Sequence, residues 1–189
     1  AVICCTTFSK EGAVEMKNRI HRFIDPKDHS RVIVSTLHSL CYQKLLKVYG
    51  RPNIVPSYHK PFIAKKIAEE LGLSTEHEEI SSLLDYIDKI PTRPSLSSID
   101  PIYIAAYNRY REVLHSEGKT DFNGLLVDTV NLLENGTLQP DNYDYIICDE
   151  SQDADSLMRR WLFVHVQAGS IPTIMLDDDQ TLYSFRNSL

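Results

Sequence analysis

Four short apolar runs, most of them rich in β-branched residues, constrain the fold of this chain more than any other feature. They are residues 1–6, 32–35, 145–148 and 173–176. Polar residues and then a helical pattern follow them, and the runs do not alternate between apolar and polar positions. Such runs are typical of parallel strands buried on both faces, whose ligands gather at the carboxyl ends of the strands. The sequence therefore predicts an α/β fold built on a parallel sheet.

Between residues 51 and 119 the pattern changes to amphipathic stretches punctuated by proline, which indicates a helical insertion. We expect a motor-like core from residues 1–49 and 120–189, with the insertion at residues 50–119. The predicted helices are 10–24, 37–48, 61–71, 80–90, 103–115 and 122–133.

Composition excludes two classes of protein. The 189 residues are 42% apolar, yet no run of 18 apolar residues is present, so we expect no membrane span. The four cysteines show no spacing suited to zinc and lie in apolar stretches, so we expect reduced, mostly buried thiols. Reduced thiols in a chain of this size predict a cytoplasmic, intracellular protein.

Charge is unevenly distributed along the chain. Residues 1–66 contain 12 Lys and Arg against 4 Asp and Glu, whereas residues 67–189 contain 8 against 22. Lys and Arg attract phosphates and carboxylates bind divalent cations, so this polarity fits a polyanion track beside a metal site. It fits an acidic, solvated surface with basic helices equally well, and charge alone leaves both readings open.

An acidic pair follows the third apolar run, because Cys148 leads directly into Asp149 and Glu150. Nucleotide hydrolases present one carboxylate to Mg²⁺ and the next to the attacking water at the carboxyl end of a strand. We therefore expect Asp149 to hold the metal shell and Glu150 to orient or deprotonate the water. The alternative is an acidic pair that only caps the next helix.

A second polar segment follows the fourth apolar run. Gln180 comes directly after three aspartates and precedes Tyr183, Phe185 and Arg186. A glutamine there can hydrogen-bond a γ-phosphate or the water, and the aromatic and arginine side chains can stack on or pair with unpaired bases. The alternative is a solvated acidic turn followed by two core aromatic residues.

Five segments taken in chain order carry a family resemblance. They are Thr7-Phe8-Ser9-Lys10 with Glu15-Met16, Ser35-Thr36-Leu37-His38-Ser39, Asp121-Phe122 with Leu125-Leu126, Asp149-Glu150-Ser151-Gln152-Asp153, and Asp177-Asp178-Asp179-Gln180 with Tyr183-Ser184-Phe185-Arg186. Together they resemble successive motifs of the UvrD/Rep type of superfamily 1 DNA helicases. The region between about residues 51 and 119 is unmatched, where that family has a helical insertion in its first RecA-like domain.

The resemblance implies a partial RecA-like (P-loop NTPase type) domain of a helicase that couples ATP hydrolysis to translocation on single-stranded DNA and to duplex unwinding. The implied cofactors are ATP and Mg²⁺, and the implied partners are single-stranded DNA and junctions of single-stranded and duplex DNA. The residues implied for the ATP site are Asp149, Glu150, Gln152 and Gln180, with Glu150 and Gln180 acting in catalysis and Asp149 on the metal. The residues implied for a single-strand track are Thr7, Phe8, Thr36, His38, Tyr183, Phe185 and Arg186. Phe8 as a core residue and His38 as the start of a helix are the structural alternatives.

The chain departs from the family pattern in several places. Leu37 stands where the family usually has Phe, Asn123 and Gly124 replace two acidic positions, and Leu176 replaces a Gly. The phosphate-binding loop G-x-x-x-x-G-K-[ST] is not found in these residues. Gly118-Lys119-Thr120 fails as a candidate because no Gly lies five residues earlier and a predicted helix precedes it. We therefore expect a part of a longer helicase that is inactive by itself.

Two other functions remain open at the level of sequence. The carboxylates after the third and fourth runs also suit a metal-dependent nuclease, which would cleave DNA without ATP. A non-catalytic module that keeps the fold to bind DNA or protein is the second.

Overall fold

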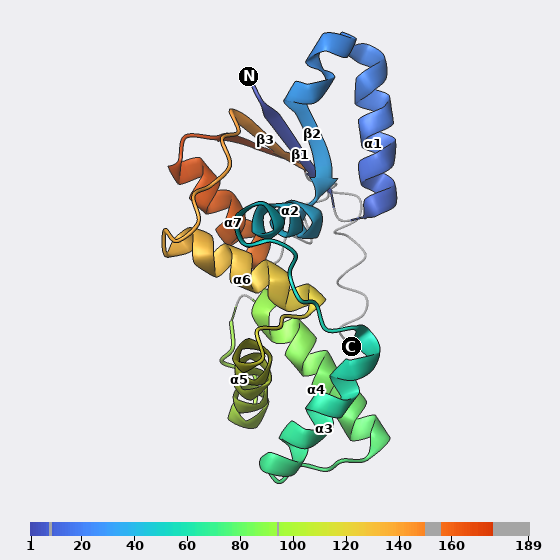
Figure 1. Ribbon diagram of the computed structural model, residues 1–189, viewed down its shortest axis with the longest axis vertical. Helices are drawn as coiled ribbons and strands as arrows, with labels where there is room; N and C mark the ends of the chain where they lie inside the picture. The colour runs from blue at the N-terminus through green and yellow to red at the C-terminus, as the bar shows by residue number, and fades with distance from the viewer. Residues whose placement is uncertain (8, 94, 150–155, 176–189) are drawn as a thin grey trace. The chain divides into compact units, whose positions relative to one another are not determined.

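The computed structural model describes residues 1–7, 9–93, 95–149 and 156–175 (Figure 1). Within these residues one parallel sheet has the strand order β2-β1-β3-β4. The strands are β1 (Ile3–Thr7), β2 (Val32–Thr36), β3 (Tyr145–Cys148) and β4 (Ile171–Ile174). The predicted α/β class with a parallel sheet is confirmed.

The sheet register places the carboxyl ends of the strands at one edge. Thr7 pairs with Thr36 on one side of β1, and Thr6 pairs with Cys148 on the other. The centre of the sheet is buried because its residues are apolar on both faces: Cys4 and Ile146 are fully buried.

Strand β4 starts two residues earlier than the predicted run at 173–176, and residue 176 lies outside the described part. Pro172 is paired with Ile146 although it has no N–H to donate. Proline is tolerated in a strand where its nitrogen faces no partner strand. Strand β4 is an outer strand of the sheet formed by the described residues, and all four of its residues are exposed.

The chain divides into two compact units. Unit 1 comprises residues 1–40, 132–154 and 158–189, and unit 2 comprises residues 41–131 and 155–157. The expected boundaries of the helical insertion, 49/50 and 119/120, stay a prediction. In the described ranges no helix is long and apolar enough to cross a bilayer.

In unit 1, helix α1 (Lys10–Phe23) packs beside β1 and β2, and a 3₁₀ turn η1 (Pro26–Arg31) leads into β2 (Figure 1). Helix α7 (Ser156–Gln167) lies in unit 1 from residue 158 onward. Its His165 is fully buried and stacks on Tyr143, with ring centroids 5.6 Å apart. This aromatic contact fixes the segment before β3 to α7.

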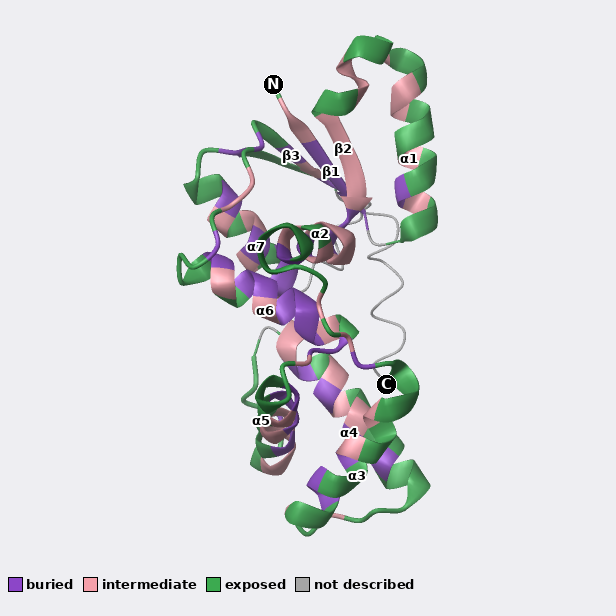
Figure 2. Ribbon diagram, viewed as in Figure 1, coloured by how far each residue is buried: buried purple, intermediate pink, exposed green. Residues whose placement is uncertain are grey.

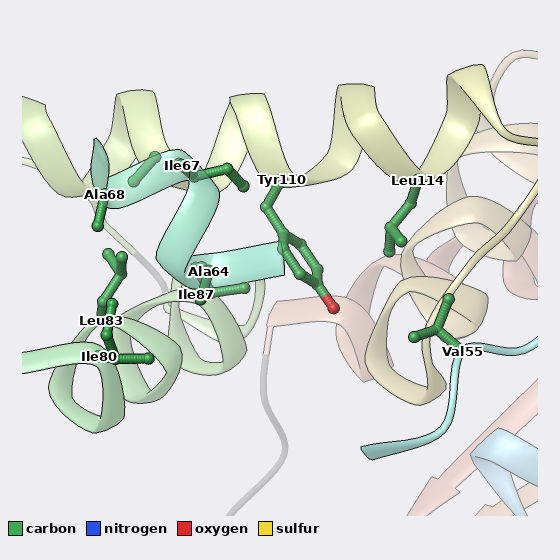
Figure 3. Close-up of a cluster of buried hydrophobic side chains, with 10 residues drawn as sticks. Val55, Ala64, Ile67, Ala68, Ile80, Leu83, Ile87, Tyr110 and Leu114 are labelled. Atoms are coloured by element: carbon green, nitrogen blue, oxygen red, sulfur yellow. The ribbon is translucent and has the colours of Figure 1, made fainter. Parts of the chain in front are cut away.

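Unit 2 is built around three helices that surround one apolar core. They are α3 (Lys60–Glu70), α4 (His77–Lys89) and α5 (Pro101–Ser116), with the 3₁₀ turns η2 (Ser57–His59) and η3 (Ile90–Thr92). Figure 3 shows Ile67, Leu83 and Tyr110 converging from different helices, and each is at most 3% exposed. Burial of Ile67 and of Leu83 contributes roughly 1.5 to 3 kcal/mol each.

Helices α2 (Leu37–Tyr49) and α6 (Phe122–Glu134) lie close to their predicted bounds. The predicted helix 103–115 starts two residues too late, because Asp100 caps α5 and Pro101 occupies its first turn. Proline lacks the N–H that would be unsatisfied there, so it favours this position. The helix begins at its cap and not at its first apolar residue.

Gly118 ends α5 and does not form a phosphate loop. Its φ is 63°, and its N–H donates to the carbonyl of His115 while that of Lys119 donates to the carbonyl of Leu114. This is the pattern of a left-handed glycine cap at a helix C-terminus. The predicted helix before Gly118-Lys119-Thr120 is confirmed, and it was one of the two reasons for rejecting this segment as a phosphate-binding loop.

Candidate functional site

The carboxyl edge of the sheet in unit 1 brings together three of the predicted site residues. Thr7 ends β1, Thr36 ends β2, and Asp149 follows β3 directly. The backbone N–H of Asp149 donates to the carbonyl of Thr6 at 3.0 Å, so the β-ladder continues to this residue. Residues that are more than 100 positions apart therefore meet at one edge because the strands are parallel and in register.

Thr36 is used locally as the cap of α2. Its hydroxyl accepts the backbone N–H of Ser39 at 3.3 Å and donates to the Ser39 hydroxyl at 2.9 Å. Thr36 is only 6% exposed. Its side chain thus satisfies one of the free N–H groups at the start of the helix. His38 is the second residue of that helix and is half-buried.

The first turn of α1 holds the end of β1 in close contact. Ser9 caps α1 by accepting the N–H of Gly12 at 2.9 Å. A Cβ on Gly12 would lie 2.9 Å from the Ser9 hydroxyl and 3.2 Å from the Thr7 hydroxyl. Gly12 is therefore part of the packing that positions Thr7. Sequence reasoning missed it, although a glycine inside a helical pattern was the available signal.

The donor chemistry at this edge suits a hard divalent cation. Asp149 supplies a carboxylate, and Mg²⁺ prefers oxygen ligands. The buried hydroxyl of Thr6, the residue to which Asp149 is hydrogen-bonded, has no hydrogen-bond partner within the described part of the chain. Side chains of His, Cys, Asp and Glu in groups of three or more that could hold a metal are not found among the described residues. The predicted carboxylate and amide partners of Asp149 lie outside them.

Seven of the predicted site residues fall outside the described residues. They are Phe8, Glu150, Gln152, Gln180, Tyr183, Phe185 and Arg186. Their roles stay predictions from the sequence.

Three buried thiols lie behind the site in β1 and β3. Burial raises the pKa of Cys148 to about 11 and that of Cys4 to about 12, and it also raises the pKa of Cys5. The thiolate is the reactive form, so these side chains are neutral and unreactive near neutral pH. The prediction that the four cysteines are mostly buried is confirmed, since all four are buried and free.

Asp121, from the Asp-Phe segment of the resemblance, lies at the centre of a buried polar network in unit 2. Its carboxylate accepts the Tyr110 hydroxyl at 3.0 Å and the backbone N–H of Gly124 at 2.6 Å. Lys60 Nζ lies 3.2 Å from one of its oxygens, and Arg111 Nη1 lies 3.8 Å from the other. The side chain is 4% exposed, so its charge is compensated almost entirely by these groups.

The network extends from Asp121 to two further carboxylates. Lys60 also pairs with Asp88, and Arg111 also pairs with Asp128. The Thr120 hydroxyl donates to Asp128 at 2.9 Å. Helices α3, α4, α5 and α6 thus share one set of ion pairs and hydrogen bonds.

Sequence reasoning missed this network. Lys60 and Arg111 stand in amphipathic helices among other charged residues, where a solvated position is the usual interpretation. Asp121 was identified only through its motif. The sequence signal for a buried network was that Tyr110 and Arg111 are adjacent in α5. Tyr110 lies on the apolar face of the helix, and Arg111 lies beside that face.

A comparison with family models matches the chain over residues 1–189 to the UvrD/REP helicase N-terminal domain. The helix-rich α/β structure with its four-stranded parallel sheet is consistent with a partial RecA-like domain of this kind.

Curated relatives are similar along almost the whole chain. The ATP-dependent DNA helicase Rep of Buchnera aphidicola subsp. Baizongia pistaciae is 25% identical over 201 residues, which cover 98% of this chain and 30% of the relative. The ATP-dependent DNA helicase Rep of Escherichia coli is 24% identical, with 98% of this chain and 30% of the relative covered. The ATP-dependent DNA helicase srs2 of Schizosaccharomyces pombe is 26% identical, with 96% and 24% covered. The chain thus spans less than a third of the length of these relatives.

Proposed function

Because the chain belongs to the UvrD/REP helicase N-terminal domain family, we propose that it is part of the first motor domain of an ATP-dependent DNA helicase. The complete protein couples ATP hydrolysis to translocation on single-stranded DNA and to unwinding at junctions with duplex DNA. The observation that carries this proposal is the position of Asp149 at the carboxyl edge of the sheet, hydrogen-bonded to the residue before Thr7. The segments assigned to ATP and to DNA meet there.

In the proposed ATP site, Asp149 holds the metal and Glu150 takes a proton from the attacking water. When bound, Mg²⁺ would neutralise negative charge on the phosphates. Gln152 and Gln180 donate hydrogen bonds to the γ-phosphate or orient the water. Two adjacent carboxylates can divide these tasks, with one on the metal and the other on the attacking water.

In the proposed DNA track, Phe8, Tyr183 and Phe185 stack on bases while Thr7, Thr36, His38 and Arg186 contact the strand. Stacking on aromatic rings is sequence-tolerant, which suits a protein that moves along DNA. Thr7 and Thr36 are 5% and 6% exposed, so each contributes only a small part of its surface to this track.

The ATP site and the DNA track are coupled through a backbone hydrogen bond between neighbouring strands. Phe8 is two residues from Thr6, whose carbonyl accepts the N–H of Asp149 at 3.0 Å. A shift of the segment that carries the ATP carboxylates therefore acts directly on the strand that leads into the DNA segment.

Fluorescence anisotropy of labelled oligonucleotides at two salt concentrations tests the track in the complete protein. We expect binding that is salt-sensitive, indifferent to sequence and weakened in a Phe8→Ala, Phe185→Ala double variant. Unchanged affinity in that variant, or preference for duplex over single strand, contradicts the assignment.

A further inference from the structure

Three aromatic rings form a row on the surface of unit 2, where η2 leads into α3. The rings of Tyr58 and His59 meet edge to face with centroids 4.6 Å apart, and those of His59 and Phe62 do so at 6.4 Å. Tyr58 is 67% exposed and Phe62 is 70% exposed. Much of the surface of α3 away from the core is likewise exposed (Figure 2). Adjoining exposed apolar side chains are a feature of interaction surfaces.

The segment that carries these rings is basic. Residues 41–68 contain 6 Lys and Arg and no Asp or Glu. Lys65 stands three residues after Phe62 on α3, which places the two side chains on the same helix face. Lys65 is exposed and has no ion pair with any described residue, so its charge is available.

The neighbouring lysines are engaged elsewhere. Lys60 is only 14% exposed and pairs with Asp88 and Asp121 inside the unit. Hydrogen bonds from Arg109 and Lys119 are the main causes of the lowered pKa values of Glu70 and Glu117, and the charge of Lys66 adds a smaller contribution to both. Lys65 is therefore a cation of this segment that lies beside the aromatic row and is free to pair with a ligand.

We propose that this surface, the α3 surface formed by Tyr58, His59, Phe62 and Lys65, binds single-stranded nucleic acid. Unpaired bases stack on Phe62 and Tyr58, and Lys65 contacts a phosphate. The inference rests on the proposed function and adds a contact for single strands on unit 2, in addition to the track assigned to unit 1.

Charge and shape favour this partner over a protein or a duplex. A polyanion complements a segment without carboxylates, and aromatic platforms with a nearby cation are the usual means of holding unpaired bases. The bases of a duplex are stacked within the helix and cannot cover the faces of these rings. An acidic protein could pair with the charge of Lys65, but its carboxylates would not stack on the aromatic rings.

A tryptophan placed in the row gives a local readout. The natural Trp161 is 2% exposed, so it provides a constant background. In the 189-residue chain, the Phe62→Trp variant should lose fluorescence when a 20-nucleotide thymidine or uridine oligomer is added, because stacked bases quench indole. The matched control is Phe23→Trp, at a position that is 87% exposed on α1 in unit 1. Its fluorescence should stay constant.

The outcomes of this titration are distinct. Quenching of the Phe62→Trp variant by both oligomers supports recognition of single strands in general, and quenching by one alone assigns the surface to DNA or to RNA. Equal quenching by a duplex, by an oligoglutamate of the same charge, or of the control variant overturns the proposal.

Affinity measurements complete the test. A Tyr58→Ala, Phe62→Ala double variant should bind the thymidine oligomer about 5-fold or more weakly, the effect of losing at least one stacked base. A Lys65→Gln variant should reduce the dependence of affinity on salt, whereas Lys27→Gln in unit 1 should not. Circular dichroism checks that each variant is folded. Unchanged affinity in the folded double variant overturns the inference.

This inference and the proposed function can fail separately. ATP hydrolysis by the complete protein, with oligonucleotide binding that is insensitive to Tyr58 and Phe62, overturns only the α3 surface. If oligonucleotides quench the Phe62→Trp variant but the complete protein shows no DNA-stimulated ATP hydrolysis, only the proposed helicase function is overturned.

Discussion

The guanidinium of Arg111 occupies the space that a side chain at position 124 would need. A Cβ built on Gly124 would lie 1.8 Å from Arg111 Nη1, and 2.6 Å from the nearer Asp121 oxygen. The absence of a side chain at Gly124 therefore allows Arg111 to reach both Asp121 and Asp128. The departure from the family pattern at this position has a physical reason in the buried network.

Gly124→Ala tests this relationship by the sign of its effect. Inside an ordinary helix the change stabilises by about 0.5 to 1 kcal/mol, because alanine loses less backbone entropy. Here the methyl group displaces Arg111, so we expect a loss of roughly 1 to 3 kcal/mol in the free energy of unfolding. Urea denaturation measures it, with Asn123→Ala as the neighbouring control. A stabilising Gly124→Ala variant contradicts the account.

Removal of the charge of Asp121 should be far more costly than removal of an exposed one. Asp121→Asn keeps the shape but leaves Lys60 and Arg111 undercompensated in a buried site, and we expect a loss of about 3 to 5 kcal/mol. Asp85→Asn is the control, because the Asp85 side chain is 72% exposed and its pair with Lys89 should contribute less than about 0.5 kcal/mol. Equal effects of the two variants on the urea midpoint rule out the central role of Asp121.

The Tyr110 hydroxyl predicts a pH dependence of stability above pH 10. Burial and the adjacent Asp121 carboxylate raise the pKa of Tyr110 above its usual value near 10. The folded chain thus keeps this proton while the unfolded chain releases it, so the stabilisation is complete below about pH 10 and declines above it.

Tyr110→Phe should therefore cost about 1 to 3 kcal/mol at pH 8, and the gap to wild type should narrow at pH 10.5. Urea denaturation at both pH values measures the gap. Tyr49→Phe, at a position 59% exposed, should show no gap at either. A gap for Tyr110→Phe that stays constant across this range argues against the raised pKa.

The buried thiols predict slow thiol–disulfide exchange between the native chain and an added disulfide reagent. Burial raises the pKa of Cys148 to about 11, so very little of it is thiolate at pH 8, and burial also slows access of the reagent. Reaction with a chromogenic disulfide reagent should be slow in buffer and fast for all four cysteines in urea. A Ser82→Cys variant at an exposed helix position supplies the reference rate. A natural cysteine that reacts at that rate in buffer contradicts the structure.

The part of the fold that follows from local patterns could be predicted from the sequence. Apolar runs without alternation gave the parallel strands, and their order in the chain placed Asp149 at a carboxyl edge. The sequence did not show that Asp149 lies beside the end of β1. This position depends on the register between β1 and β3, which only the structure shows. The start of β4 was misplaced because proline usually interrupts a strand, and only an outer strand tolerates Pro172.

The buried network could not be predicted, because its members are distant in sequence and have ordinary residue types. Lys60 Nζ lies 3.2 Å from a carboxylate oxygen of Asp121, although Lys60 begins α3 and Asp121 directly precedes α6. From the sequence, Gly124 is only a position where an acidic residue of the family pattern is missing. In the structure, Arg111 occupies the space that a side chain at this position would need. Pairings of this kind depend on tertiary packing and leave no periodic signal.

The rate of DNA-stimulated ATP hydrolysis by the complete protein carrying Glu150→Gln tests the central claim most directly. The change removes the base that activates water and leaves Asp149 to hold the metal, so ATP should still bind while turnover falls by roughly 10²-fold or more. Asp149→Asn, measured in parallel, should weaken the dependence of turnover on Mg²⁺. Hydrolysis by both variants within about a factor of two of wild type would contradict the assignment of this acidic pair to the ATP site.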